Sequence, residues 1–138
     1  MNVLFVDDET DFLETLLKRM KKREVDVAGV KSGEEALDHL EKHPGIDVVV
    51  LDVKMPGMDG IETLREIKRR HPLVEVIMLT GHADVGVAIV GMELAAFDYL
   101  MKPVDFDQLL YKIQDACKKR RIHQEKINAR KKAPQAPD

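Results

Sequence analysis

Residues 46–62 read IDVVVLDVKMPGMDGIE, and this stretch joins a buried strand to a helix through a short loop. The near-continuous apolar run Ile46–Leu51 predicts a strand that is covered on both faces, because a half-exposed strand would alternate apolar and polar residues. A loop with Pro and Gly follows, and Asp59 with Glu62 three residues later is typical of a helix N-terminus. His71-Pro72 ends that helix, since the residue before proline avoids helical backbone angles. The stretch therefore predicts one strand–loop–helix unit.

The same alternation of short apolar runs and longer helical patterns extends in both directions from this unit. Further strands are predicted at Asn2–Asp7, Val25–Gly29, Val74–Leu79 and Phe97–Met101. A helical apolar period follows each strand. Five strands that alternate with five helices are typical of an α/β fold with a parallel sheet.

Two of the predicted helices have distinct features. The helix after Asp84, its predicted N-cap, is the weakest, and we expect Met92 of this helix to pack in the core. The last helix begins near Asp105 and is expected to bury Phe106, Leu109, Leu110 and Ile113.

Length and composition favour one cytoplasmic domain. The chain has 138 residues, of which 44% are hydrophobic and 34% are charged, as in ordinary globular proteins. We expect no leader peptide, and no apolar run approaches the roughly 18 residues that a membrane span needs. Its one cysteine, Cys117, can form no internal disulfide, which fits a reducing compartment.

Charge divides the chain into two parts. Residues 118–138 contain eight Lys or Arg and two acidic residues, a net charge of +6, so the remaining residues carry −9 of the total of −3. We expect a main domain over residues 1–117 and a basic helical extension over 118–138, a solvated helix end or linker with disorder from about Lys131. The extension has no aromatic residue for base stacking and no apolar stripe for lipid, which argues against nucleic acid as a partner of this chain alone and against a membrane.

The candidate functional residues follow the ends of four predicted strands. Asp7-Asp8 ends the first strand, Asp52 the third, Thr80 the fourth and Lys102 the fifth. Carboxyl ends of parallel strands meet at one edge of the sheet, where open α/β folds bind their ligands. A single Asp in such a place is commonly a helix cap or a turn former, but this combination on successive strands predicts a site.

The residue types at this edge suit phosphoryl transfer. Clustered carboxylates repel one another and favour a bound cation, and an all-oxygen ligand set suits Mg²⁺. Asp52 could then attack phosphorus as a nucleophile. Lys102 can balance a phosphoryl oxygen as a point charge, and Thr80 can donate a hydrogen bond to another.

Four segments of the chain are similar to the response-regulator receiver domain of two-component systems. They are Val6–Glu9, Val49–Gly60, Met78–Gly81 and Phe97–Pro103. The resemblance covers about residues 2–117. It implies a flavodoxin-like, doubly wound sheet of five parallel strands in the order 2-1-3-4-5.

The resemblance also implies a role for each residue of the site. Asp52 would be the phosphoacceptor, and Lys102 would contact the phosphoryl group, with a cis peptide bond to Pro103. Mg²⁺ would be held by three carboxylates and one backbone carbonyl, those of Asp7, Asp8, Asp52 and Lys54.

Further residues would report or adjust the phosphorylation. Thr80 would move toward the phosphoryl group, and Tyr99 would swing inward as the switch. Gly81 would leave room for the phosphoryl group, while Lys54 and His82 would adjust the rate of dephosphorylation.

Residues 80–84 and 96–100 are most similar to receivers of sigma-54-dependent activators. Ala95 departs from that group, which usually has glycine there. No ATPase or DNA-binding domain follows in this sequence.

The favoured hypothesis is a phosphoacceptor switch that catalyses only its own phosphorylation and dephosphorylation. Its partners would be a sensor histidine kinase and, through the surface of the fourth helix, fifth strand and fifth helix, an output protein or a second copy. A phosphohydrolase of the haloacid-dehalogenase class is an alternative, but it expects an aspartate at the position of Lys54. The other alternative is a binding module that is not phosphorylated. The sequence gives it no support, because every residue of the site is present.

Overall fold

The computed structural model describes residues 1–54, 59–81 and 85–132. In chain order the elements are β1 (Asn2–Val6), α1 (Thr10–Lys22), β2 (Asp26–Val30), α2 (Gly33–Lys42), β3 (Val48–Asp52), α3 (Gly60–Arg70), β4 (Glu75–Thr80), α4 (Val85–Glu93), β5 (Asp98–Met101) and α5 (Phe106–Lys132). The strands form one parallel sheet in the order β2-β1-β3-β4-β5. The predicted fold class, strand order and alternation are therefore confirmed.

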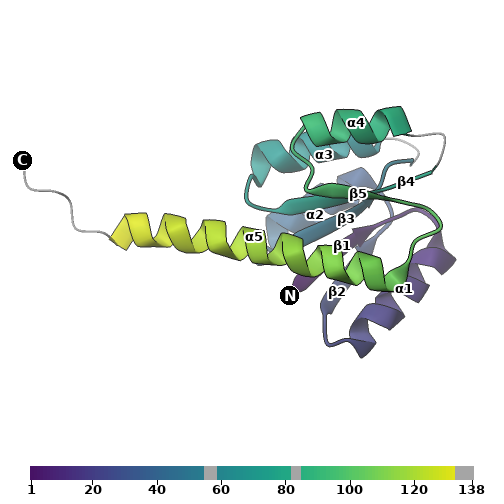
Figure 1. The fold of residues 1–138 in the computed structure, drawn as a ribbon, viewed down its shortest axis with the longest axis horizontal. Helices are drawn as coiled ribbons and strands as arrows, with labels where there is room; N and C mark the ends of the chain where they lie inside the picture. The colour runs from purple at the N-terminus through teal and green to yellow at the C-terminus, as the bar shows by residue number, and fades with distance from the viewer. Residues whose placement is uncertain (55–58, 82–84, 133–138) are drawn as a thin grey trace, which may run out of the picture.

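Helices cover both faces of the sheet (Figure 1). Alternate residues of β1 point to opposite faces: Val3 and Phe5 pack with α1 and α5, whereas Leu4 and Val6 pack with α2 and α3. Every residue of β3 and β4 is buried, as expected for central strands with helices on both sides. Among the described residues, no helix is long and apolar enough to cross a membrane.

Side chains cap the N-termini of α2 and α3, and the predicted cap of α3, Asp59, is confirmed. Ser32 accepts a hydrogen bond from the backbone N–H of Glu35 at 3.1 Å, and Asp59 accepts one from the N–H of Glu62 at 2.8 Å. These side chains satisfy N–H groups that have no partner within the helix. Asp84, the predicted cap of α4, lies outside the described residues.

Helix α4 is present as predicted, but the expected packing of Met92 was wrong. Its buried residues are the small ones, Ala88 and Gly91, and Val87 is half-buried against the core. Met92 is 40% exposed and does not pack in the core. A Cβ on Gly91 would lie 2.2 Å from the Met78 sulfur, so the Met78 side chain packs directly against the backbone of α4 at this glycine. Four larger apolar side chains of α4 are exposed: Val85, Ile89, Val90 and Met92.

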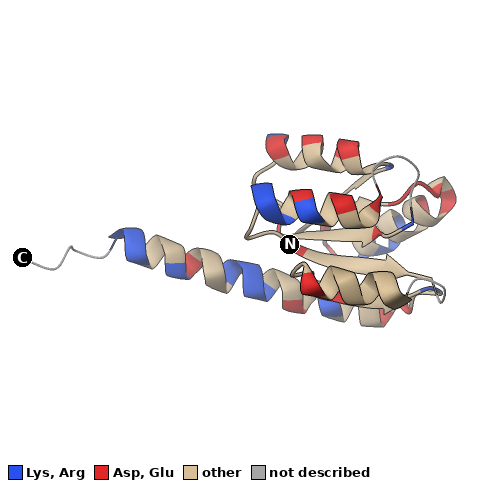
Figure 2. Ribbon diagram, turned by 90° about the horizontal axis from the view of Figure 1, so that it is seen from above, with Lys and Arg blue, Asp and Glu red and all other residues tan. Residues whose placement is uncertain are grey.

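Helix α5 continues without a break beyond the sheet (Figure 1). It runs through Lys132, past the point near Lys131 where disorder was expected, and residues 133–138 lie outside the described residues. Lys and Arg recur along the projecting part (Figure 2). The Phe106 side chain at its start is only half-buried, whereas Leu109, Leu110 and Ile113 are buried as predicted.

Two helices are each followed, two residues after their last residue, by a residue with left-handed backbone angles. Ala95 has φ 71° after α4, and Glu24 has φ 60° after α1. The N–H of Ala96 bonds the carbonyl of Gly91 and the N–H of Ala95 bonds that of Met92, which is a Schellman motif with Ala95 at its left-handed position. Glycine adopts these angles without a steric penalty.

We therefore expect Ala95→Gly and Glu24→Gly each to raise the free energy of unfolding by about 0.5–1 kcal/mol, a gain reduced by the greater freedom of glycine in the unfolded chain. Urea unfolding measures the effect. Glu14→Gly, at an exposed position inside α1, is the control and should destabilise by about 1 kcal/mol. Loss of stability in all three variants would contradict the explanation.

Candidate functional site

The predicted site residues meet at the carboxyl ends of four strands. Asp52 and Thr80 are the last residues of β3 and β4, while Asp7 and Lys102 directly follow β1 and β5. The side chains of Asp7, Asp52 and Thr80 are buried, and Asp8 is exposed. Because all of these strands are parallel, residues up to 95 positions apart come together at one edge of the sheet.

Three carboxylates form an all-oxygen cluster at this edge. Asp7, Asp8 and Asp52 each offer one oxygen, and these oxygens lie within 4.8 Å of one another. Asp7 is held in place by the backbone N–H of Glu9, which donates to its Oδ1 at 2.8 Å. Oxygen ligands at this spacing, with one exposed carboxylate, fit a partly hydrated Mg²⁺. The Lys54 carbonyl stays a predicted ligand, whereas its N–H donates to Asp52 Oδ1 at 3.2 Å.

The electrostatic environment of Asp52 is unfavourable for its charged form. Burial and the neighbouring Asp7 carboxylate raise the pKa of Asp52 to about 6, against the opposing effects of the Lys54 N–H and Lys102. Asp8 adds a smaller repulsion. Any positive charge added near Asp52 therefore stabilises its ionised form.

Lys102 supplies one such charge from β5. Its Nζ lies 3.4 Å from Asp7 Oδ2 and 3.6 Å from Asp52 Oδ2. The same ammonium lies 4.8 Å from the ring centroid of Phe12 in α1, within cation–π range. Sequence reasoning missed Phe12 as a neighbour of the site, because its periodicity indicates only a helix face.

The predicted switch residues lie on neighbouring strands. The Thr80 hydroxyl is buried and donates a 3.5 Å hydrogen bond to the Leu100 carbonyl of β5, and the Tyr99 side chain is 38% exposed. Gly81 is half-buried beside Thr80. The Lys102–Pro103 peptide bond is cis, the isomer that the resemblance implies. His82 lies outside the described residues.

Comparison with known proteins gives the same result from sequence and from structure. The family model of the response regulator receiver domain matches residues 3–114. The DNA-binding transcriptional regulator NtrC of Klebsiella pneumoniae is 36% identical over 132 residues, which are 95% of this chain and 28% of that protein. The transcriptional regulatory protein ZraR of Escherichia coli is 35% identical over 116 residues, 84% of this chain and 26% of that protein.

These curated relatives bear out the similarity to receivers of sigma-54-dependent activators, and the chain spans little more than a quarter of their length. A solved structure, the response regulator receiver domain protein from Clostridium thermocellum, superposes with a TM-score of 0.84 at 36% identity. The match covers 88% of this chain and 97% of that one. The family model, the relatives and the fold agree, and the chain belongs to the response regulator receiver domain family of two-component systems.

Proposed function

We propose that this receiver domain takes a phosphoryl group from a sensor histidine kinase onto Asp52 in a Mg²⁺-dependent reaction. The observation that carries the proposal is the placement of Asp52: buried, beside two further carboxylates, and 3.6 Å from the Lys102 ammonium. With a pKa of about 6, Asp52 is mostly ionised at neutral pH and is available as a nucleophile.

The transfer requires little of the protein beyond positioning and charge compensation. An Asp52 oxygen forms a bond to phosphorus while the bond from phosphorus to the donor histidine nitrogen breaks, and the imidazole keeps the electron pair. The Lys102 ammonium offsets negative charge on the phosphoryl oxygens. The Lys54 N–H holds the attacking carboxylate in place by a hydrogen bond. Bound Mg²⁺, held by Asp7, Asp8 and Asp52, supplies the remaining positive charge when present.

The phosphoryl group then alters a surface through Thr80 and Tyr99. Thr80 turns its hydroxyl from the Leu100 carbonyl toward a phosphoryl oxygen, and the exposed Tyr99 ring moves inward. The surface of α4, β5 and α5 carries this change to an output protein or a second copy. Its exposed apolar side chains include Val85, Ile89, Tyr99 and Tyr111.

Thr80→Ala is expected to accept the phosphoryl group but to lose the response at Tyr99, because the hydroxyl that links the two is gone. Amide NMR spectra with and without a phosphate mimic measure the response. Thr15→Ala, whose hydroxyl donates to the Asp11 carbonyl on the exposed side of α1, is the control and should respond as wild type does. A full Tyr99 response in Thr80→Ala would refute the assigned link.

The remaining assignments complete the proposal. The domain acts in the cytoplasm, catalyses only its own phosphorylation and dephosphorylation, and occupies residues 1–117, with 118–138 as an extension. Lys54, Gly81 and His82 adjust the lifetime of the phosphoryl group.

Intact mass spectrometry after incubation with acetyl phosphate tests the proposal. The expected result is a gain of one phosphoryl group with Mg²⁺ and no gain with a chelator. No gain under either condition, in protein that is folded by circular dichroism, would favour a binding module that works without phosphorylation.

A further inference from the structure

A second polar cluster lies at the opposite edge of the sheet, where β3 and β4 begin. It contains two buried carboxylates, those of Asp47 and Glu75, each only 2% exposed. The two residues are adjacent, since the N–H of Glu75 donates to the carbonyl of Asp47 at 3.2 Å. Neither belongs to the site at Asp52, which lies at the other ends of the same strands.

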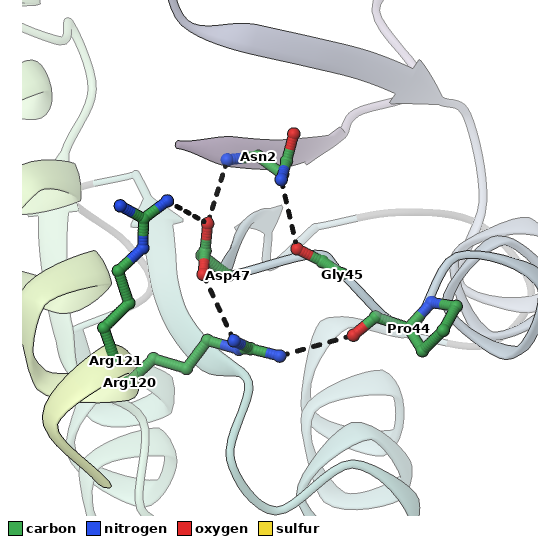
Figure 3. A network of polar contacts seen from close by, with 6 residues as sticks. All are labelled: Asn2, Pro44, Gly45, Asp47, Arg120 and Arg121. Atoms are coloured by element: carbon green, nitrogen blue, oxygen red, sulfur yellow. Dashed lines mark hydrogen bonds and ion pairs between the residues drawn. The ribbon is translucent and has the colours of Figure 1, made fainter. Parts of the chain in front are cut away.

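The Asp47 carboxylate is surrounded by donors from α5 and β1 (Figure 3). Its Oδ1 lies 3.3 Å from a guanidinium nitrogen of Arg120, and its Oδ2 lies 3.3 Å from one of Arg121. The backbone N–H of Asn2 donates to Oδ2 at 3.0 Å. Arg120 also donates to the Pro44 carbonyl at 3.3 Å, so it joins α5 to the segment before β3.

The negative charge of Glu75 is compensated by Lys119, the residue before Arg120 in α5. Lys119 Nζ lies 3.6 Å from Glu75 Oε1. Burial lowers the pKa of Lys68, a second nearby cation, and the negative charge of Glu75 opposes this shift. Three consecutive residues, 119–121, thus place positive charges against the two buried carboxylates.

A buried carboxylate without a cation is strongly destabilising. The cations here come from residues beyond Cys117, where the apolar period that holds α5 to the sheet ends. We infer that the edge formed by Pro44, Asp47 and Glu75 is a docking surface for a basic helix, and that residues 119–121 of this chain occupy it.

Docking changes the role of the basic extension. Residues 119–121 form ion pairs that hold α5 to the domain, so they are not part of a freely solvated helix end. The rigid unit extends through Arg121, and the helix up to Lys132 leaves the domain in a direction that the docking surface sets. Any element joined to this helix is then held at a fixed orientation to the receiver domain.

Hydrogen exchange of the full chain, followed by mass spectrometry, tests this inference. The two test proteins are Asp47→Asn, which keeps an acceptor for the Asn2 N–H, and the double variant Arg120→Gln/Arg121→Gln. The matched control is Lys118→Gln/Lys126→Gln, which removes the same charge from two exposed positions of the same helix.

We expect amides of residues 119–126 to exchange about tenfold faster in both test proteins than in wild type, because an undocked helix end opens more often. The control should remain within about twofold of wild type. Amides of β1 and β3 show in the same experiment that the fold is intact. Equal exchange in the arginine and lysine double variants would overturn the inference, even if Asp47→Asn failed to fold.

Discussion

Asp52→Asn is expected to accept no phosphoryl group from acetyl phosphate in the presence of Mg²⁺, while wild type gains one. The amide has the shape of the carboxylate but lacks its charge and is not a nucleophile toward phosphorus. Asp52 touches only Lys54 and Lys102 by hydrogen bond or ion pair among the described residues, so its replacement leaves the core packing unchanged. Intact mass measures the loss directly.

Asp59→Asn is the matched control for this experiment. Asp59 is an exposed N-cap in the loop after β3, and asparagine caps helices as well as aspartate does. This variant should gain a phosphoryl group as wild type does. A single phosphorylation that persists in Asp52→Asn would show that another residue is the acceptor.

Without Mg²⁺, wild type should lose stability relative to Asp52→Asn as the pH rises from about 4 through 6. The pKa of Asp52 is raised to about 6 in the folded protein, against about 3.9 in an unfolded chain. The folded state therefore binds the proton more tightly, and this stabilisation is fully present only below pH ~4. Above pH 6 it is lost, because the buried carboxylate is charged in both states.

The expected difference is about 2 kcal/mol between pH 4 and pH 8, in favour of Asp52→Asn at the higher pH. Urea unfolding of both proteins in chelator measures it, and the difference between them removes the effects of all other titrating groups. Added Mg²⁺ should stabilise wild type more than the variant at pH 8. A difference that does not change with pH would contradict the assigned electrostatic environment.

The sequence was sufficient for the fold and for the residues of the main site. Short apolar runs that end on polar residues predict the alternating strands and the shared site, because parallel strands bring their carboxyl ends to one edge. The strand order was implied by the resemblance to receiver domains. Asp7, Asp52, Thr80 and Lys102 are consequently placed together as predicted.

Packing between distant segments could not be predicted in the same way. In α4, the small residues Ala88 and Gly91 are buried, with Gly91 against the Met78 side chain, whereas the apolar pattern alone favours the larger side chains. Nothing in the sequence around Phe12 indicates that the Lys102 ammonium lies over its ring. Asp47 interrupts an apolar run, and nothing local indicates that its partners lie more than 70 residues away in α5.

Locating the phosphoryl group within the wild-type chain shows directly whether Asp52 is the acceptor. After reaction with acetyl phosphate and Mg²⁺, borohydride reduction converts an aspartyl phosphate to homoserine, and mass spectrometry of the peptides identifies the altered residue. We expect homoserine at position 52 and at no other aspartate. Homoserine at position 7 or 8 with an unaltered Asp52 would contradict this expectation.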